Sequence, residues 1–180
     1  MPSVFLSPSL QEWNPYINGG NEEYFMNLVA DAIEPYLTAS GISFARNTPT
    51  QTLSQAIAQS NAGNYDLHLA IHSNAAGAAN SGNVRGTDVY YYPTSSRGKR
   101  AADIIAENYK DIYPLPDRVK TVATTSLAEL KRTKAPAVLI ETAYHDNLAD
   151  ADWIQENIGA IGRNLAQSIA EFLGVPFVDL

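Results

Sequence analysis

Apolar residues recur along this chain at two spacings, one typical of helices and one typical of strands. After Asn21, a good helix cap, they follow one another at intervals of three and four, which predicts a helix that begins there. Pro35 should kink or shorten this helix near its end. The residues with helical spacing are Phe25, Leu28, Val29, Ala32, Ile33 and Leu37.

The same reading predicts further helices and a set of short strands. Helices are predicted around residues 53–58, 96–109 and 154–172. Short apolar or alternating runs predict strands at residues 4–6, 42–45, 65–72, 89–92 and 138–140. Strands and helices that alternate in this way predict one α/β domain over residues 1–180. We expect a three-layer fold, with a twisted, mostly parallel sheet of about six strands flanked by helices.

The amino-acid composition argues against several classes of binding partner and structural feature. The chain has 12 Lys and Arg against 19 Asp and Glu residues and a net charge of -7, which argues against binding to nucleic acid. It has no cysteine, so disulfides and cysteine metal sites are excluded. The first residues lack the basic start and apolar run of a secretory signal, and no apolar stretch is long enough for a membrane span. We expect a monomer.

Polar side chains follow three of the predicted strands, at the point where each strand ends. They are the segment Ser7–Gln11, the residues His72 and Asn74, and Glu141. Ligands of such a sheet bind beyond the carboxyl ends of its strands, so we expect these groups to meet there. A carboxylate and an imidazole at the ends of apolar strands are costly unless they are paired or used. Composition alone supports a second interpretation equally well, in which His72 and Glu141 only pair with each other at the strand ends and have no role in a functional site.

Two acidic residues, Glu22 and Glu23, open the first predicted helix. An acidic residue in a first turn usually does no more than offset the helix dipole. Because two are present, one can stabilise the helix end while the other points into the cleft.

In combination, these segments resemble the zinc-dependent N-acetylmuramoyl-L-alanine amidases of the Amidase_3 type. Their order and spacing carry the resemblance, which covers nearly the whole chain. The matching segments are GGNEEY at 19–24, DLHLAIHSNA at 66–75, GTDVYYY at 86–92, APAVLIETAY at 135–144 and HDN at 145–147.

The resemblance implies a site and a reaction. Glu23 and His72 would be ligands of a zinc ion, Glu141 would be the general base, and Asn74 would contact the substrate. The implied reaction is hydrolysis of the amide bond between N-acetylmuramic acid and L-alanine in peptidoglycan, by a water that zinc activates. The implied partners are peptidoglycan and its muropeptides. The protein would act on the cell wall, as an autolysin or a phage lysin does.

The chain departs from the family pattern at one ligand. The family's first zinc ligand is a histidine in a Pro-Gly-His segment after the first strand, where this chain has SPSLQ at 7–11. The third ligand is therefore open between Gln11, whose amide oxygen is a weak donor for zinc, and His145. His68 lies four residues before His72 on the same strand face, roughly 13 Å away, so it cannot share an ion with it.

The missing histidine leaves other functions open. One alternative is a metal-free or catalytically silent domain of the same fold that binds peptidoglycan. A weaker alternative is a zinc peptidase with other substrates. The basic segment 130–134 could bind a peptide carboxylate, but we expect it to be exposed and to aid solubility.

Overall fold

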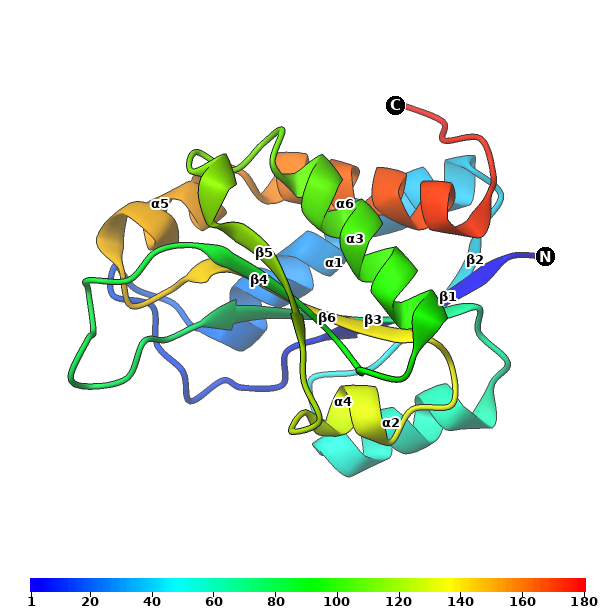
Figure 1. Ribbon diagram of the computed structural model, residues 1–180, viewed down its shortest axis with the longest axis horizontal. Coiled ribbons are helices and arrows are strands. Elements are labelled where there is room, and N and C mark those ends of the chain that lie inside the picture. The colour runs from blue at the N-terminus through cyan, green and yellow to red at the C-terminus, as the bar shows by residue number, and fades with distance from the viewer.

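A single six-stranded sheet forms the centre of the computed structural model, which describes residues 1–180. Its strand order is β2-β1-β3-β6-β4-β5 (Figure 1). The strands are β1 (Ser3–Pro8), β2 (Ser43–Arg46), β3 (Leu67–Asn74), β4 (Thr87–Tyr91), β5 (Val119–Ala123) and β6 (Ala137–Tyr144). Neighbouring strands are parallel except for β4 and β6, which are antiparallel. The predicted fold class, a mostly parallel α/β sheet of about six strands, is confirmed.

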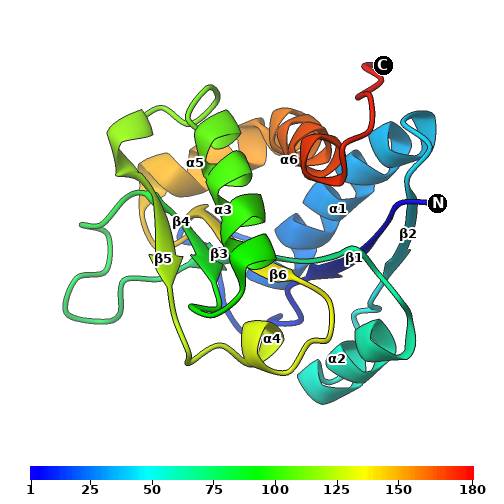
Figure 2. The same ribbon diagram turned by 45° about the vertical axis from the view of Figure 1, so that its right-hand side comes forward.

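Helices cover both faces of this sheet and give three layers (Figures 1 and 2). One face carries α1 (Glu22–Ala39), α3 (Ser96–Tyr109), α5 (Leu148–Glu156) and α6 (Ile158–Leu173). The other face carries only α2 (Leu53–Ala62) and the four-residue α4 (Ala128–Lys131). A short 3-10 helix, η1 (Pro116–Arg118), precedes β5. No helix is long and apolar enough to cross a membrane.

The two faces of the sheet differ sharply in how much apolar surface they bury. The face under α1, α3 and α6 contributes to a cluster of 31 buried residues, among them Leu6, Leu69 and Ile140. The opposite face contributes to a cluster of only four: Ala70, Leu130, Ala137 and Leu139. Because side chains alternate along a strand, this thinner face also receives the polar side chains of β1, β3 and β6. The sheet therefore keeps its main core on one side and leaves room for a polar site on the other.

Some elements differ from the sequence-based expectation. Helix α1 continues past Pro35 to Ala39, held by the burial of Ile33 and Leu37 on either side of the proline. The helix expected at 154–172 is preceded by a separate helix, α5, and the two are divided at Asn157. Neither β5 nor α4 was expected, because β5 is a largely exposed edge strand and α4 has too few residues to show a helical period.

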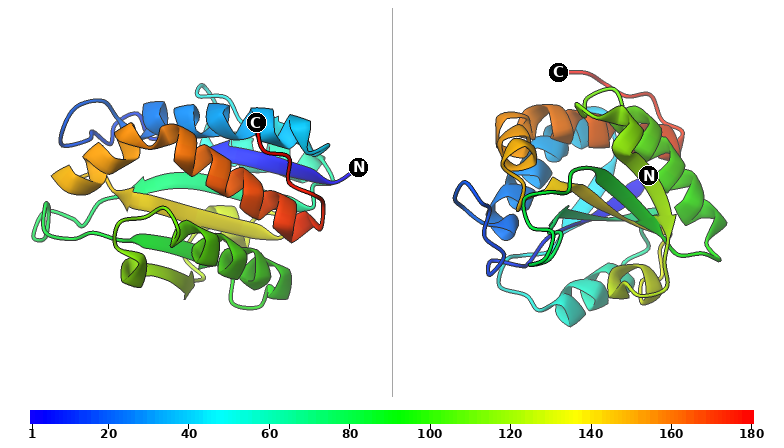
Figure 3. Two further views of the ribbon diagram at one scale, coloured as in Figure 1. Left: turned by 90° about the horizontal axis from the view of Figure 1, so that it is seen from above. Right: turned by 60° about the vertical axis from the view of Figure 1, so that its left-hand side comes forward.

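Helices α1 and α6 pack so closely that one glycine is required between them (Figure 3). A Cβ atom at Gly162 would lie 2.5 Å from the Cβ of Ala32 and 2.9 Å from its carbonyl carbon. Gly162→Ala should therefore lower the free energy of unfolding by about 1–3 kcal/mol, because backbone cannot move aside as a flexible side chain can. Denaturant unfolding measures this change.

The same helix supplies the control for this variant. Gly159 is also in α6 and has nothing within 4 Å of a built Cβ. Gly159→Ala should leave stability unchanged or raise it, by at most about 1 kcal/mol. Equal effects of the two substitutions would contradict the close-packing explanation.

Candidate functional site

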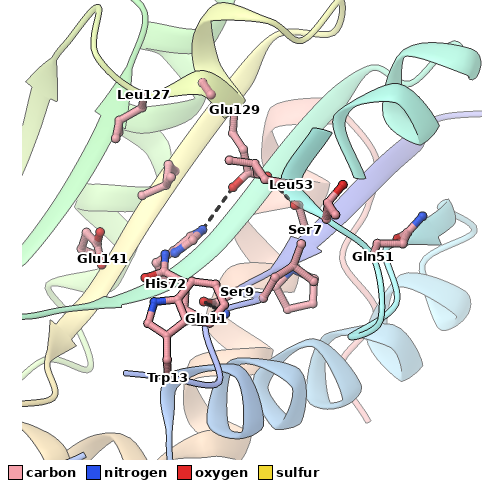
Figure 4. Close-up of a pocket in the computed structure, with 15 residues that line it drawn as sticks. Ser7, Ser9, Gln11, Trp13, Gln51, Leu53, His72, Leu127, Glu129 and Glu141 are labelled. Carbon is pink, nitrogen blue, oxygen red and sulfur yellow. Dashed lines mark hydrogen bonds and ion pairs between the residues drawn. The ribbon is translucent and has the colours of Figure 1, made fainter. Parts of the chain in front are cut away.

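A cavity of about 470 Å³ opens on the thinner face of the sheet, beside α2 and α4. It lies at the carboxyl ends of β1 and β3 and next to Glu141 of β6, where the sequence predicted a ligand site. The exposed side chains of Trp13 and Leu53 are among those that line it (Figure 4). The polar residues that line it include Ser7, Gln11, His72, Glu129 and Glu141.

His72 lies between two carboxylates, one on each side of its ring. Its Nδ1 is 2.9 Å from Oε1 of Glu22, and its Nε2 is 3.1 Å from Oε2 of Glu129. All three side chains are buried. Burial alone would lower the pKa of His72, but the hydrogen bonds to Glu129 and Glu22 raise this pKa well above its usual value. The ring is therefore held in one orientation by charge on both sides.

The acidic residue that reaches His72 is Glu22, whereas the sequence predicted Glu23. Asn21 caps α1 by accepting a hydrogen bond from the backbone of Tyr24, so the helix begins at Glu22. Successive helical residues point about 100° apart, and only the first of the pair faces the strand ends. Glu22 is 1% exposed. Glu23 is only half-buried and instead accepts a hydrogen bond from the Asn27 amide at 3.1 Å.

Glu129, which sequence reasoning missed, is the second carboxylate beside His72. It stands on α4, and the hydroxyl of Ser7 donates to its Oε1 (Figure 4). Nε2 of His68 lies 3.1 Å from the same oxygen. Burial would raise the pKa of Glu129, but the hydrogen bonds from His68 and His72 lower it far below the usual value. Nothing in the short segment around Glu129 signals this position, because its partners lie far away in the sequence.

Glu141 stands beside His72 in the sheet, as the sequence predicted for the end of an apolar strand. The two residues are register partners in β6 and β3, and Asp88 of β4 is the partner on the other side. Oε2 of Glu141 is buried and has no hydrogen-bond partner. Burial raises the pKa of Glu141 to about 7; His72 opposes this rise, while the charges of Glu22 and Asp88 add to it. A carboxyl group in this state can take up and release a proton near neutral pH.

The two residues considered as a third ligand lie in different places. Gln11 lines the cavity, and its amide oxygen accepts a hydrogen bond from Asn14, whose amide also donates to Glu22 at 3.1 Å. His145 lies outside the cavity lining. Its Nδ1 is 2.9 Å from the hydroxyl of Ser73, and its ring stacks on Tyr16 with centroids 5.1 Å apart. Each of the two is therefore linked to Glu22 through one other residue, Gln11 through Asn14 and His145 through Ser73, whose backbone N–H donates to Glu22 at 3.4 Å, and the third ligand stays a prediction.

Two other polar residues of β3 have local roles in the structure. His68 is fully buried, with Nδ1 2.8 Å from the Ser60 hydroxyl and Nε2 facing Glu129, and so is a histidine bonded to its neighbours. Asn74 ends β3, and its side-chain oxygen accepts a hydrogen bond from the backbone of Ala75. Asn74 is not among the residues that line the cavity, so its contact with substrate stays a prediction.

Some side chains of this site are possible ligands of a zinc ion. Oε1 of Glu22 and Nδ1 of His72 are donors of the kind that zinc takes, and they lie side by side. No group of three or more His, Cys, Asp or Glu side chains is arranged to hold one metal ion. The neutral amide of Asn14 donates to Glu22 and to the amide oxygen of Gln11. The site therefore offers two protein donors for a zinc ion, Glu22 and His72, and no third His, Cys, Asp or Glu side chain joins them.

The fold and the site define a class: an α/β protein with a mostly parallel sheet and a buried site of carboxylates and imidazole at the strand ends. Residues 11–173 match the family Amidase_3, N-acetylmuramoyl-L-alanine amidase. The chain belongs to this family. It is 30% identical over 163 residues to N-acetylmuramoyl-L-alanine amidase LytC of Bacillus subtilis (strain 168), across 87% of this chain and 32% of LytC. The chain therefore spans about a third of the length of this relative.

Solved structures of similar proteins share the fold. N-acetylmuramoyl-L-alanine amidase AmiC2 of Nostoc punctiforme superposes with a TM-score of 0.83 at 18% identity, over 96% of this chain and 97% of that one. The catalytic domain of CwlV, N-acetylmuramoyl-L-alanine amidase from Bacillus (Paenibacillus) polymyxa var. colistinus, also gives 0.83, at 19% identity, over 98% and 100%. These likenesses show that the three proteins have the same architecture.

The different surroundings of Glu22 and Glu23 predict different costs of removing them. Glu22→Ala should lower the free energy of unfolding by about 2 kcal/mol at neutral pH, because a buried ring nitrogen of His72 loses its partner. Glu23→Ala should change it by less than about 0.5 kcal/mol. Denaturant unfolding with a chelator present measures both, and a larger loss for Glu23→Ala would contradict this geometry.

Proposed function

We propose that the chain hydrolyses the amide bond between N-acetylmuramic acid and L-alanine in peptidoglycan, and so acts on the cell wall. Membership of the amidase family supports this reaction. The observation that carries the proposal is Glu141, whose buried Oε2 has no protein partner and which lines the same cavity as His72. An unpaired buried carboxylate destabilises a fold, and a proton-transfer role explains why one is placed here.

The side chains divide the work of this reaction among them. Glu141 would take the proton of the attacking water and pass it to the amine that leaves. Glu22 and His72 would hold a zinc ion, with the Gln11 amide as a weaker oxygen donor. Such an ion supplies polarisation of the scissile carbonyl and acidification of water. The exposed ring of Trp13 at the mouth gives an apolar surface against which a sugar or peptide can lie.

A metal-free domain that only binds peptidoglycan explains less of the structure. Binding of a neutral sugar or a short peptide does not require a carboxyl group whose pKa is raised to about 7 by burial. Nor does it require His72 to be fixed between Glu22 and Glu129. Both features fit a site in which a proton moves.

Product analysis tests the reaction directly. Purified peptidoglycan treated with the protein should release peptides that begin with a free L-alanine amine and leave intact glycan strands. Mass spectrometry of the soluble products identifies the cleaved bond. Release of disaccharides, or of peptides cut between two amino acids, would assign the protein to another reaction.

Glu141→Gln should lower turnover and, at high pH, raise stability. Turnover should fall by about 10²- to 10⁴-fold, because the proton shuttle is lost. In wild type without metal, burial raises the pKa of Glu141 from 4.5 to about 7, so the folded state binds this proton more tightly than the unfolded chain does. Its stability should therefore fall as the pH rises through this interval, and the variant should escape that loss.

Unfolding free energies at pH 5 and pH 8, with a chelator present, measure the second effect. The variant should gain stability relative to wild type at pH 8 and gain much less at pH 5. Glu156→Gln, at an exposed position of α5, is the matched control and should change neither quantity. Near wild-type turnover in Glu141→Gln would remove this residue from the proposed reaction.

The weak third donor predicts that an added histidine tightens zinc binding. Leu10 and Gln11 both line the cavity that contains His72. Leu10→His or Gln11→His should raise zinc affinity, since imidazole is a better donor for zinc than an amide oxygen. Competition with a chelator of known strength at fixed pH measures the change. If neither variant binds zinc more tightly than wild type, the metal is not held beside this segment.

A further inference from the structure

The basic side chains of this chain are unevenly distributed along the sequence. Residues 87–134 contain nine of the twelve Lys and Arg residues but only six of the nineteen Asp and Glu residues. The three basic residues elsewhere, Arg46, Arg85 and Arg163, each form an ion pair with a carboxylate. Within 87–134, only Lys99 and Lys110 are paired in this way. The other seven cations of this segment have no carboxylate partner, although the chain as a whole is acidic.

Three of these unpaired cations line a second cavity, of about 490 Å³. They are Arg97 in the first turn of α3, Lys131 at the end of α4 and Lys134 before β6. No carboxylate lines this basic cavity, and its other polar side chains carry hydroxyl groups. The start of α3 adds the partial positive charge of a helix N-terminus. The basic cavity therefore suits an anionic group that a ligand supplies.

The basic cavity lies on the same face of the sheet as the cavity beside Glu141. Two side chains of β6 point to this face, and Leu139 lines the first cavity while Ala137 lines the second. Helix α4 borders both, with Glu129 at the first cavity and Lys131 at the second. Glu141 and Ala137 are four residues apart in β6, a separation of about 13 Å. A ligand of that length can reach from one cavity to the other.

Two tyrosine side chains lie along the line from Glu141 to the basic cavity. In the antiparallel pair of β4 and β6, Tyr90 is the register partner of Leu139. Tyr92 follows two residues later and lines the basic cavity. Both rings pack against the small apolar cluster of this face of the sheet, and both are only half-buried. They provide a partly exposed aromatic surface against which a peptide can lie.

We propose that the basic cavity binds the terminal carboxylate of the peptide branch of peptidoglycan whose first amide is cleaved beside Glu141. This inference rests on the proposed function, because it extends the same substrate beyond its L-alanine. A four-residue peptide in extended form measures about 13–14 Å, similar to the separation along β6. The glycan is a continuous chain of sugars, whereas the peptide is a branch with a free carboxyl end. Ammonium and guanidinium groups bind such a carboxylate through charge-assisted hydrogen bonds.

Binding of a free peptide tests this site without any reaction. The probe is the tetrapeptide L-alanyl-γ-D-glutamyl-L-lysyl-D-alanine, titrated into the protein and followed by NMR chemical shifts. The double variant Lys131→Gln, Lys134→Gln should raise its Kd by about 10-fold, as the loss of two exposed ion pairs predicts. Arg132→Gln is the matched control, because Arg132 is an exposed and unpaired neighbour that does not line the cavity. This control should bind the tetrapeptide as wild type does.

A change in the peptide identifies the group that is bound. The same tetrapeptide with a C-terminal amide should bind wild type about 10-fold more weakly than the acid does, because the cations lose their charged partner. The double variant should bind the acid and the amide equally. Hydrolysis of a muramoyl tetrapeptide gives a second readout. Its KM should rise in the double variant while kcat stays unchanged, since the distant carboxylate is bound equally in the ground and transition states.

The outcomes separate this inference from the proposed function. An unchanged Kd in the double variant, an equal loss in Arg132→Gln, equal binding of acid and amide by wild type, or no binding of the tetrapeptide would overturn the site. So would a double variant that loses binding of poly(glycerol phosphate) but keeps that of the tetrapeptide. If wild type cleaves peptidoglycan as proposed while the double variant binds the tetrapeptide normally, only this inference fails. If binding depends on the two lysines but no such cleavage occurs, the peptide site stands and only the proposed reaction fails.

Discussion

Charged groups removed from water must find partners of opposite charge, and this constraint organises the site end of the molecule. His72, Glu22 and Glu129 are all buried, and each would be costly to bury alone. Their pairing brings the first turn of α1 and the short helix α4 to opposite sides of one imidazole ring. The loops before α1 and α4 must therefore place these two helices on opposite sides of His72. Asn14 and Gln11 continue the network on one side, and Ser7 and His68 continue it on the other.

The large apolar core on one face of the sheet offsets the cost of burying this polar network on the other face. Apolar burial is concentrated between the sheet and α1, α3 and α6, so this side contributes most of the hydrophobic stabilisation of the strands. The opposite face can then carry histidines and carboxylates at positions where a symmetric three-layer protein would place aliphatic residues. Alternation along the strands assigns the residues to the two sides. Leu69 and Ile71 face the large core, whereas His68 and His72 point to the opposite face, where His72 lines the cavity.

Sequence patterns were sufficient to predict the layers, most of the strands, and the placement of the segment Ser7–Gln11, His72 and Glu141 at the cavity, because these follow from local patterns. His72 and Glu141 end apolar runs, and such runs are visible without a structure. The choice between Glu22 and Glu23 needed the phase of α1 relative to the sheet, which depends on where Asn21 caps the helix. Glu129 could not be found, since a helix of four residues has no period and its partner His72 lies 57 residues away in sequence. Whether His145 or Gln11 approaches Glu22 was likewise a matter of tertiary packing.

The distances in sequence between the site residues have a consequence for how the protein folds. Ser7 meets Glu129 across 122 residues, His68 meets it across 61, and His72 meets Glu22 across 50. Contacts of such separation require large loops to close, so each is costly in chain entropy unless the pairing of β1, β3 and β6 has already brought its residues together. Any ligand that needs the complete set then binds the native state and not its partly folded precursors. Such a ligand would therefore raise the free energy of unfolding by an amount set by its concentration and affinity.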